Sequence, residues 1–191
     1  MGKLNGEKIK TCVFISGKGT NLLSIIKSSR DYNFPAKVTL IISDRINAPG
    51  LIYAKKYNIP FKVFSSENKS KFETKTLLEL KKNHIRLICL AGFMKILSPK
   101  FIERFRYKIL NIHPSLLPKY KGTNTHKRVL NNKEKYSGCT VHYVTSKLDS
   151  GPIILKKKIL IKKNDNEKSL KYKILKQEHL IYSQAIRLLY K

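Results

Sequence analysis

The feature that most constrains the fold is a regular alternation of short apolar runs with segments of helical periodicity. Runs rich in valine, isoleucine and leucine suit buried strands, and they cover residues 10–15, 36–43, 61–64 and 85–91. Helical patterns follow them at about residues 22–26, 49–57, 70–83 and 99–106. This alternation predicts an α/β fold with a doubly wound, Rossmann-like and mostly parallel sheet.

The pattern changes after Gly138. Residues 139–144 and 153–161 both resemble strands, and the turn sequence Asp-Ser-Gly-Pro at 149–152 lies between them. We therefore expect two antiparallel strands at one edge of the sheet. A closing helix over 167–189 would pack one apolar stripe, made of Leu170, Ile174, Ile181, Ala185 and Leu188.

One further apolar run, residues 108–110, ends in a polar pair. Asn111 and His113 are two positions apart, so on a strand their side chains share one face, and Pro114 then ends the strand. An amide and an imidazole at a strand end could stabilise an oxyanion, and the imidazole could also exchange a proton. The alternative is a core histidine next to a turn asparagine.

A glycine-containing loop, SGKGTN at residues 16–21, joins the first predicted strand to the first helix. The free N–H groups of that helix could hold a phosphate, and Thr20 and Asn21 could both cap the helix and contact the anion. The spacing does not match a P-loop, and Leu22 replaces the third glycine of a dinucleotide-binding fingerprint. A tight turn without a ligand is the alternative.

Asp149 lies in the turn between the last two predicted strands. Aspartate before Ser-Gly-Pro can be only a turn former. If its carboxylate met His113, it would favour the charged imidazolium and hold the ring in one orientation.

Composition limits the other classes of function. The formal net charge is +28, but the lysines are spread along the chain, which favours a composition bias over a nucleic-acid-binding patch. The positive field would still attract anionic substrates. Cys12, Cys89 and Cys139 match no zinc pattern and are expected to be buried thiols, so we expect no metal. Without a signal peptide or a membrane span, we expect a cytoplasmic protein.

Several longer motifs occur in a fixed order: SGKGTN, AGFMKILSP, LNIHPSLLPKYKGTNTH, GCTVHYV with LDSGPII, and QEHLIY. In these motifs the chain resembles the glycinamide ribonucleotide formyltransferase family, from about residue 9 to its end. The resemblance implies one formyltransferase domain over 1–191, with residues 1–8 as a flexible extension. It also implies formyl transfer from 10-formyltetrahydrofolate to the amine of glycinamide ribonucleotide in purine biosynthesis.

The resemblance assigns roles to particular residues. The catalytic residues would be Asn111, His113 and Asp149. The ribonucleotide would contact Gly19, Thr20, Asn21 and Glu178. The folate would contact Lys69, Met94, Lys95, Ile96, Leu97 and Asn111. It further implies two small-molecule partners, no specific nucleic acid, no membrane and no metal, in a monomer or weak homodimer.

The chain departs from the family pattern at three positions. Lys69 and Lys95 replace common arginines, which keeps the charge but loses bidentate hydrogen bonding. Ser150 replaces a frequent glycine, which is tolerable if its φ is negative. In the implied mechanism, Asn111 and protonated His113 donate to the formyl oxygen, and the proton moves either through His113 or through water held by Asp149.

Three rival interpretations are two other kinds of folate-dependent formyl enzyme and a homologue without activity. Methionyl-tRNA formyltransferases would carry a further C-terminal domain and formyltetrahydrofolate hydrolases an extra N-terminal one, and we expect neither here. The continuation KYKGTNTH favours the ribonucleotide enzyme. A non-catalytic homologue is disfavoured because all three reactive positions are present.

Overall fold

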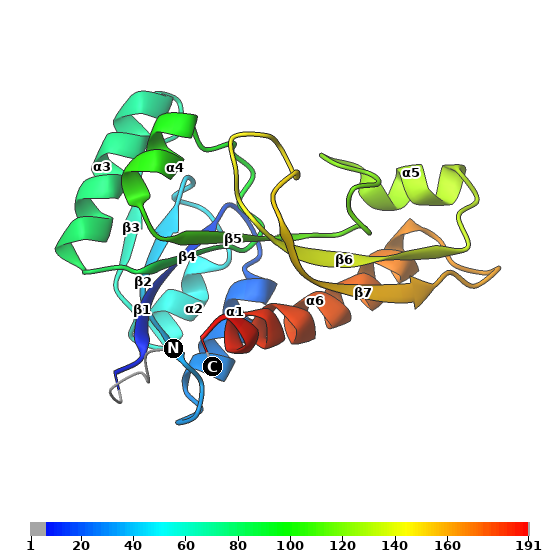
Figure 1. Ribbon diagram of the computed structural model, residues 1–191, viewed down its shortest axis with the longest axis horizontal. Coiled ribbons are helices and arrows are strands. Elements are labelled where there is room, and N and C mark those ends of the chain that lie inside the picture. The colour runs from blue at the N-terminus through cyan, green and yellow to red at the C-terminus, as the bar shows by residue number, and fades with distance from the viewer. Residues whose placement is uncertain (1–6, 191) are drawn as a thin grey trace.

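A computed structural model describes residues 7–190. Its strands are β1 (Ile9–Ile15), β2 (Ala36–Ser43), β3 (Phe61–Val63), β4 (Leu87–Leu90), β5 (Lys108–His113), β6 (Tyr136–Tyr143) and β7 (Ile153–Leu160). They form one sheet in the order β3-β2-β1-β4-β5-β6-β7 (Figure 1). The strands are parallel up to β5, and β6 and β7 are antiparallel, which confirms the predicted doubly wound sheet with antiparallel C-terminal strands.

Helices cover both faces of this sheet. They are α1 (Thr20–Ser29), α2 (Leu51–Lys56), α3 (Lys69–Lys82), α4 (Pro99–Phe105), α5 (Thr125–Asn131) and α6 (Glu167–Leu189). In Figure 1, α1 and α6 lie on one side of the strands and α3 and α4 on the other.

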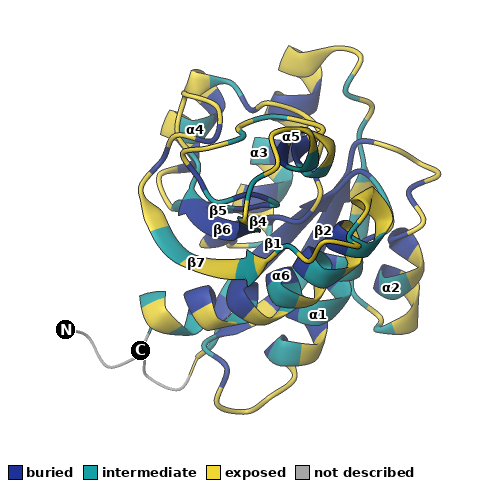
Figure 2. Cartoon of the chain, turned by 90° about the vertical axis from the view of Figure 1, so that its right-hand side faces the viewer, coloured by how far each residue is buried: buried dark blue, intermediate teal, exposed yellow. Residues whose placement is uncertain are grey.

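Two apolar cores result from this layering. One contains Val13 and Ile15 of β1 with residues of α1, α2 and α6, and the other contains Cys12 and Phe14 with residues of α3 and α4. Successive residues of β1 therefore enter opposite cores, as expected for a strand buried on both faces. Figure 2 shows the buried residues concentrated on the strands and on the sheet-facing sides of the helices.

Most predicted element ends lie within two residues of those observed, but β6 begins three residues earlier than predicted, at Tyr136. Helix α5 was not predicted, because only Thr125 and Val129 of this short polar segment are buried. One predicted core position is wrong. Leu188 is 49% exposed, since the buried stripe of α6 ends at Ile186.

Tyr182 of α6 ties the helix to the centre of the sheet. Its side chain is fully buried, and its hydroxyl lies 3.1 Å from the Leu90 carbonyl oxygen and 3.0 Å from that of Leu110. Because β4 and β5 both lead toward the polar pair, this contact fixes α6 relative to the strands that position the site.

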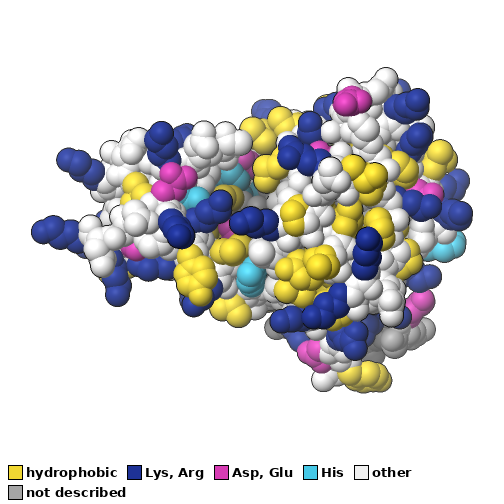
Figure 3. All heavy atoms as spheres, turned by 180° about the vertical axis from the view of Figure 1, so that it is seen from behind, with side chains coloured by type: hydrophobic (Ala, Val, Ile, Leu, Met, Phe, Trp, Pro, Cys, Tyr) yellow, Lys and Arg dark blue, Asp and Glu magenta, His cyan; other side chains and the backbone are white. Residues whose placement is uncertain are grey.

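Residues 1–6 of the expected N-terminal extension lie outside the described residues, whereas Lys8 donates hydrogen bonds to the carbonyl oxygens of Ser29 and Asp31. The three cysteines are buried and free, as predicted. Within residues 7–190, no helix combines the length and apolarity needed to span a bilayer. Lysine and arginine side chains are scattered across the face seen in Figure 3.

Candidate active site

The end of β5 places the predicted polar pair next to two further titratable side chains. Asn111 and His113 point to the same face of the sheet, and the antiparallel register pairs Asn111 with His142 of β6. The loop after β6 then brings Asp149 within reach of both histidines. Its carboxylate oxygens lie 3.3 Å from His113 Nδ1 and 3.7 Å from His142 Nε2. The structure thus brings the predicted trio together.

His113 lies between two oxygen acceptors. Nε2 lies 2.9 Å from the carbonyl oxygen of Tyr120, and Nδ1 faces the Asp149 carboxylate. Both neighbours can only accept hydrogen bonds, so each suits a ring nitrogen that carries a hydrogen. His113 is 5% exposed and Asp149 8%, so water screens this pair weakly.

His142 lies between one acceptor and one donor. Its Nδ1 lies 2.8 Å from the carbonyl oxygen of Tyr143 and must donate, which leaves Nε2 as an acceptor. Burial lowers the pKa of His142 below its ordinary value and favours this neutral form. Asn111 Nδ2, 3.3 Å away, then donates to Nε2. The contact decides which side of the Asn111 amide is nitrogen, and an amide nitrogen has a second N–H to offer a ligand.

His142 was not among the predicted site residues. The usable signal was the antiparallel strand pair, since any strand beside β5 places one residue opposite Asn111. That residue could be identified only once the register was known.

The backbone around Asp149 is shaped to present its carboxylate. Asp149 adopts a φ of 46°, in the left-handed region, and its Oδ2 accepts a hydrogen bond of 2.8 Å from the backbone N–H of Gly122. A Cβ at Gly151 would lie 1.9 Å from the Tyr143 carbonyl oxygen, so this turn requires glycine there. Ser150 has no positive φ, which fulfils the condition for its replacing a glycine.

The loop after β1 forms a second part of the site. Gly19, with a φ of 68°, is the N-cap of α1 and makes no side-chain cap, so the expectation that Thr20 or Asn21 caps the helix is wrong. A Cβ on Gly19 would lie 2.7 Å from the Cα of Gly50, so close packing of two backbones requires glycine. The Asn21 side chain turns instead toward α6.

Asn21 meets a residue 157 positions away. Its Nδ2 donates to Oε2 of Glu178 at 2.7 Å, so the structure joins two residues that the resemblance had assigned to one substrate. Burial raises the pKa of the Glu178 carboxyl. The Oδ1 atom of Asn21 is buried and has no hydrogen-bond partner among residues 7–190. A buried acceptor without a partner fits a site that a ligand completes.

The segment expected to contact folate lies beside this loop, because the backbone N–H of Met94 donates to Ser16 Oγ at 2.9 Å. Met94 is 64% and Ile96 58% exposed, and Lys95 and Lys69 are also exposed. Leu97 is only 4% exposed and packs in the core, so its side chain attaches the segment to the core. Exposed apolar side chains beside a polar site suit a ligand with an apolar body.

Across residues 7–190, no group of three or more His, Cys, Asp or Glu side chains is arranged to hold a metal ion. The cluster at the end of β5 offers one amide donor, one imidazole, and a carboxylate that contacts the imidazole. Such a set can stabilise negative charge on a reacting oxygen.

Comparisons with known proteins show the family to which the chain is similar. Residues 9–186 match the family described as Formyl transferase. The chain is 42% identical over 181 residues to the phosphoribosylglycinamide formyltransferase of Haemophilus influenzae, covering 93% of this chain and 85% of that protein. It superimposes with a TM-score of 0.92 on glycinamide ribonucleotide transformylase 1 from Symbiobacterium toebii, at 36% identity, covering 98% and 93% of the two chains.

Longer relatives also match. The chain is 38% identical over 190 residues to the trifunctional purine biosynthetic protein adenosine-3 of Gallus gallus. That match covers 98% of this chain and 19% of the relative, so the chain spans about a fifth of the length of the trifunctional proteins.

Proposed function

The chain belongs to the formyl transferase family, and on this premise we propose that it formylates the amine of glycinamide ribonucleotide, with 10-formyltetrahydrofolate as the donor. The observation that carries the proposal is the cluster at the end of β5, where Asp149 contacts His113 and His142, and His142 contacts Asn111. The reaction belongs to purine biosynthesis. We further propose that the protein works in the cytoplasm as a monomer or weak homodimer.

The ribonucleotide is proposed to bind at the loop after β1. Its phosphate would lie against the free N–H groups at the start of α1, next to Gly19 and Thr20. A hydroxyl of the ribose could donate to the unpaired Oδ1 of Asn21, whose Nδ2 is held by Glu178. This arrangement supplies both an anion site and an acceptor, which is what a sugar phosphate requires.

The folate is proposed to bind along the neighbouring segment. Met94 and Ile96 offer exposed apolar surface, and the exposed ammonium groups of Lys69 and Lys95 suit its acidic tail. When bound, the formyl folate supplies an activated carbonyl carbon to the substrate amine. Asn111 pairs with Leu90 at the end of β4, four residues before Met94, and also belongs to the catalytic cluster.

Within the cluster, each residue has a separate task. As the amine attacks, negative charge develops on the formyl oxygen, and the second N–H of Asn111 can donate to it. The positive charge of His113 stabilises the same oxygen, while Asp149 keeps the ring charged and oriented. Direct donation by His113 requires Nε2–H to leave the Tyr120 carbonyl. The amine proton must reach the folate nitrogen, through His113 or through water that Asp149 holds.

A steady-state assay with purified protein, formyl folate and glycinamide ribonucleotide tests the proposal. The wild-type protein should form the formylated product, and His113→Ala should lower turnover by about 10²-fold or more, the usual effect of losing one oxyanion-stabilising group. His84→Asn is a matched control, because His84 is exposed and lies in the turn after α3. Absence of product with wild type would refute the function, and full turnover in His113→Ala would refute the mechanism alone.

A further inference from the structure

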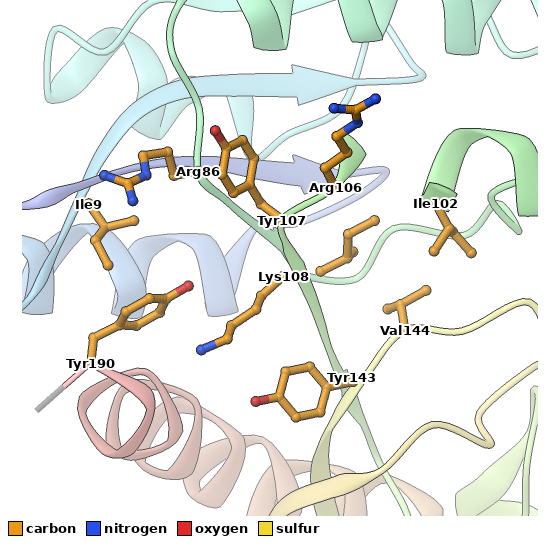
Figure 4. A pocket seen from close by; sticks show the side chains of 10 residues that line it. Ile9, Arg86, Ile102, Arg106, Tyr107, Lys108, Tyr143, Val144 and Tyr190 are labelled. Carbon is orange, nitrogen blue, oxygen red and sulfur yellow. The ribbon is translucent and has the colours of Figure 1, made fainter. Parts of the chain in front are cut away.

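A cavity of about 430 Å³ lies at the opposite end of the sheet from this cluster (Figure 4). Ile9 at the start of β1, Lys108 at the start of β5 and Tyr190 after α6 all line it. Lys108 and His113 are the two ends of β5, so at about 3.3 Å per residue the cavity is about 17 Å from the catalytic histidine. The two sites are therefore distinct.

The cavity is electropositive. Three cationic side chains, Arg86, Arg106 and Lys108, line it, and no Asp or Glu is among the described residues that do so. Like charges gathered around one hollow repel one another in the absence of an anion. A ligand with negative charge would relieve that repulsion, and a dianion would do so better than a monoanion.

Three tyrosines give the cavity aromatic walls. Figure 4 shows the Lys108 side chain extending between Tyr143 and Tyr190, with Arg86 beside Tyr107. The Lys108 ammonium lies 4.7 Å from the centre of the Tyr190 ring, and the Arg86 guanidinium 5.9 Å from that of Tyr107. These cation–π contacts hold both charges at the aromatic surface.

The remaining surface of the cavity is apolar and includes Ile102, Ile109 and Val144. Burial raises the pKa of Tyr190 to about 12, so its hydroxyl keeps its hydrogen and can donate. The cavity thus combines anion-binding cations, a hydroxyl donor, planar rings and apolar contacts. Its volume is within the range of ligand pockets.

We propose that this cavity binds a nucleoside monophosphate as a second site, independent of the formyl transfer reaction. Arg86 and Lys108 would contact the phosphate, since an arginine fork and a lysine ammonium both suit its oxygens. The base would stack on a tyrosine ring, as planar bases do on aromatic side chains. Tyr143 suits this role, because Tyr107 and Tyr190 already face cations, and a simple carboxylate would leave its ring without a stacking partner.

Isothermal titration of the full chain with AMP tests the proposal. The expected result is one site in wild type, with ribose 5-phosphate and adenosine each binding at least about tenfold more weakly, because each lacks half of the complementary chemistry. The double variant Arg86→Gln/Lys108→Gln should weaken AMP binding about 10²-fold, since it removes two charge-assisted contacts. Lys55→Gln/Lys56→Gln removes two exposed cations of α2 and should change the affinity less than about twofold.

AMP could also enter the phosphate loop proposed for the ribonucleotide, so Asn21→Ala is titrated in parallel. Retained AMP binding in Asn21→Ala supports the second site, whether or not the protein transfers formyl groups. Loss of binding in Asn21→Ala but not in Arg86→Gln/Lys108→Gln would overturn the proposal, as would wild-type protein that binds no AMP. Circular dichroism of each variant, and the single variant Arg86→Gln, separate lost binding from lost folding.

Discussion

Replacing Asp149 by asparagine should remove the negative charge beside His113 without changing the size of the site. Oδ2 of Asp149 accepts a hydrogen bond from the Gly122 N–H and also faces His113 Nδ1. Only the oxygen of an asparagine amide can accept the Gly122 hydrogen bond, so this oxygen takes the place of Oδ2 and the amide nitrogen faces His142 Nε2. The hydrogen-bond partners of His113 therefore stay the same, and what is lost is the negative charge beside its ring.

The size of the effect follows from the distance between the charges. Unit charges 3.3 Å apart interact by about 5 kcal/mol at an effective dielectric constant of about 20. Desolvation of the buried pair offsets part of this, which leaves about 3–4 kcal/mol. If that stabilisation acts on the transition state, turnover should fall about 10²–10³-fold.

The assay is formyl transfer at saturating concentrations of both substrates between pH 6 and 9. Asp149→Asn should lose turnover at every pH, while the Michaelis constants change little because Asp149 does not hold the substrates. Asp31→Asn makes the same chemical change in an exposed pair with Arg187 and should behave as wild type. Turnover of Asp149→Asn within threefold of wild type would show that the negative charge beside His113 is not needed.

Three further predictions concern other parts of the molecule. Asn21→Ala should raise the Michaelis constant for the ribonucleotide about tenfold with little change in turnover, and an unchanged constant would remove Asn21 from the binding site. His142→Leu should lower turnover about tenfold, because the Asn111 amide loses the contact that orients it. The double variant with Asn111→Ala should be no slower than Asn111→Ala alone. Additive losses in the double variant would disprove the coupling of the two residues. Burial lowers the pKa of three histidines, His126, His142 and His179, below the ordinary 6.5. Between pH 6.5 and 5 the unfolded chain therefore binds more protons than the folded chain. The free energy of unfolding should fall as the pH falls through this range. The raised pKa of the Glu178 carboxyl opposes this loss with one group against three, and urea titrations showing higher stability at pH 5.5 than at pH 7 would contradict the prediction.

The fold was largely predictable because its elements follow local patterns. The apolar runs of β1 and β2 and the stripe of α6 are periodic over enough residues to be recognised, and their ends were predicted to within one residue. Helix α5 was missed because its sequence has little periodicity and only two of its residues are buried. Leu188 was misassigned because an apolar residue one turn beyond a buried stripe resembles a part of that stripe.

Asn111 and His113 could be placed on one face of a strand from the sequence alone, since alternation along a strand is a local property of the backbone. The motifs then associated Asp149 and Glu178 with a formyltransferase site. Which atoms meet depends on the tertiary structure. The contacts of Asp149 with His113 and of Asn21 with Glu178 join segments 36 and 157 residues apart, and such contacts depend on strand register, turn geometry and helix packing rather than on local pattern. The same dependence explains why His142 became visible as a partner of Asn111 only when β5 and β6 were paired.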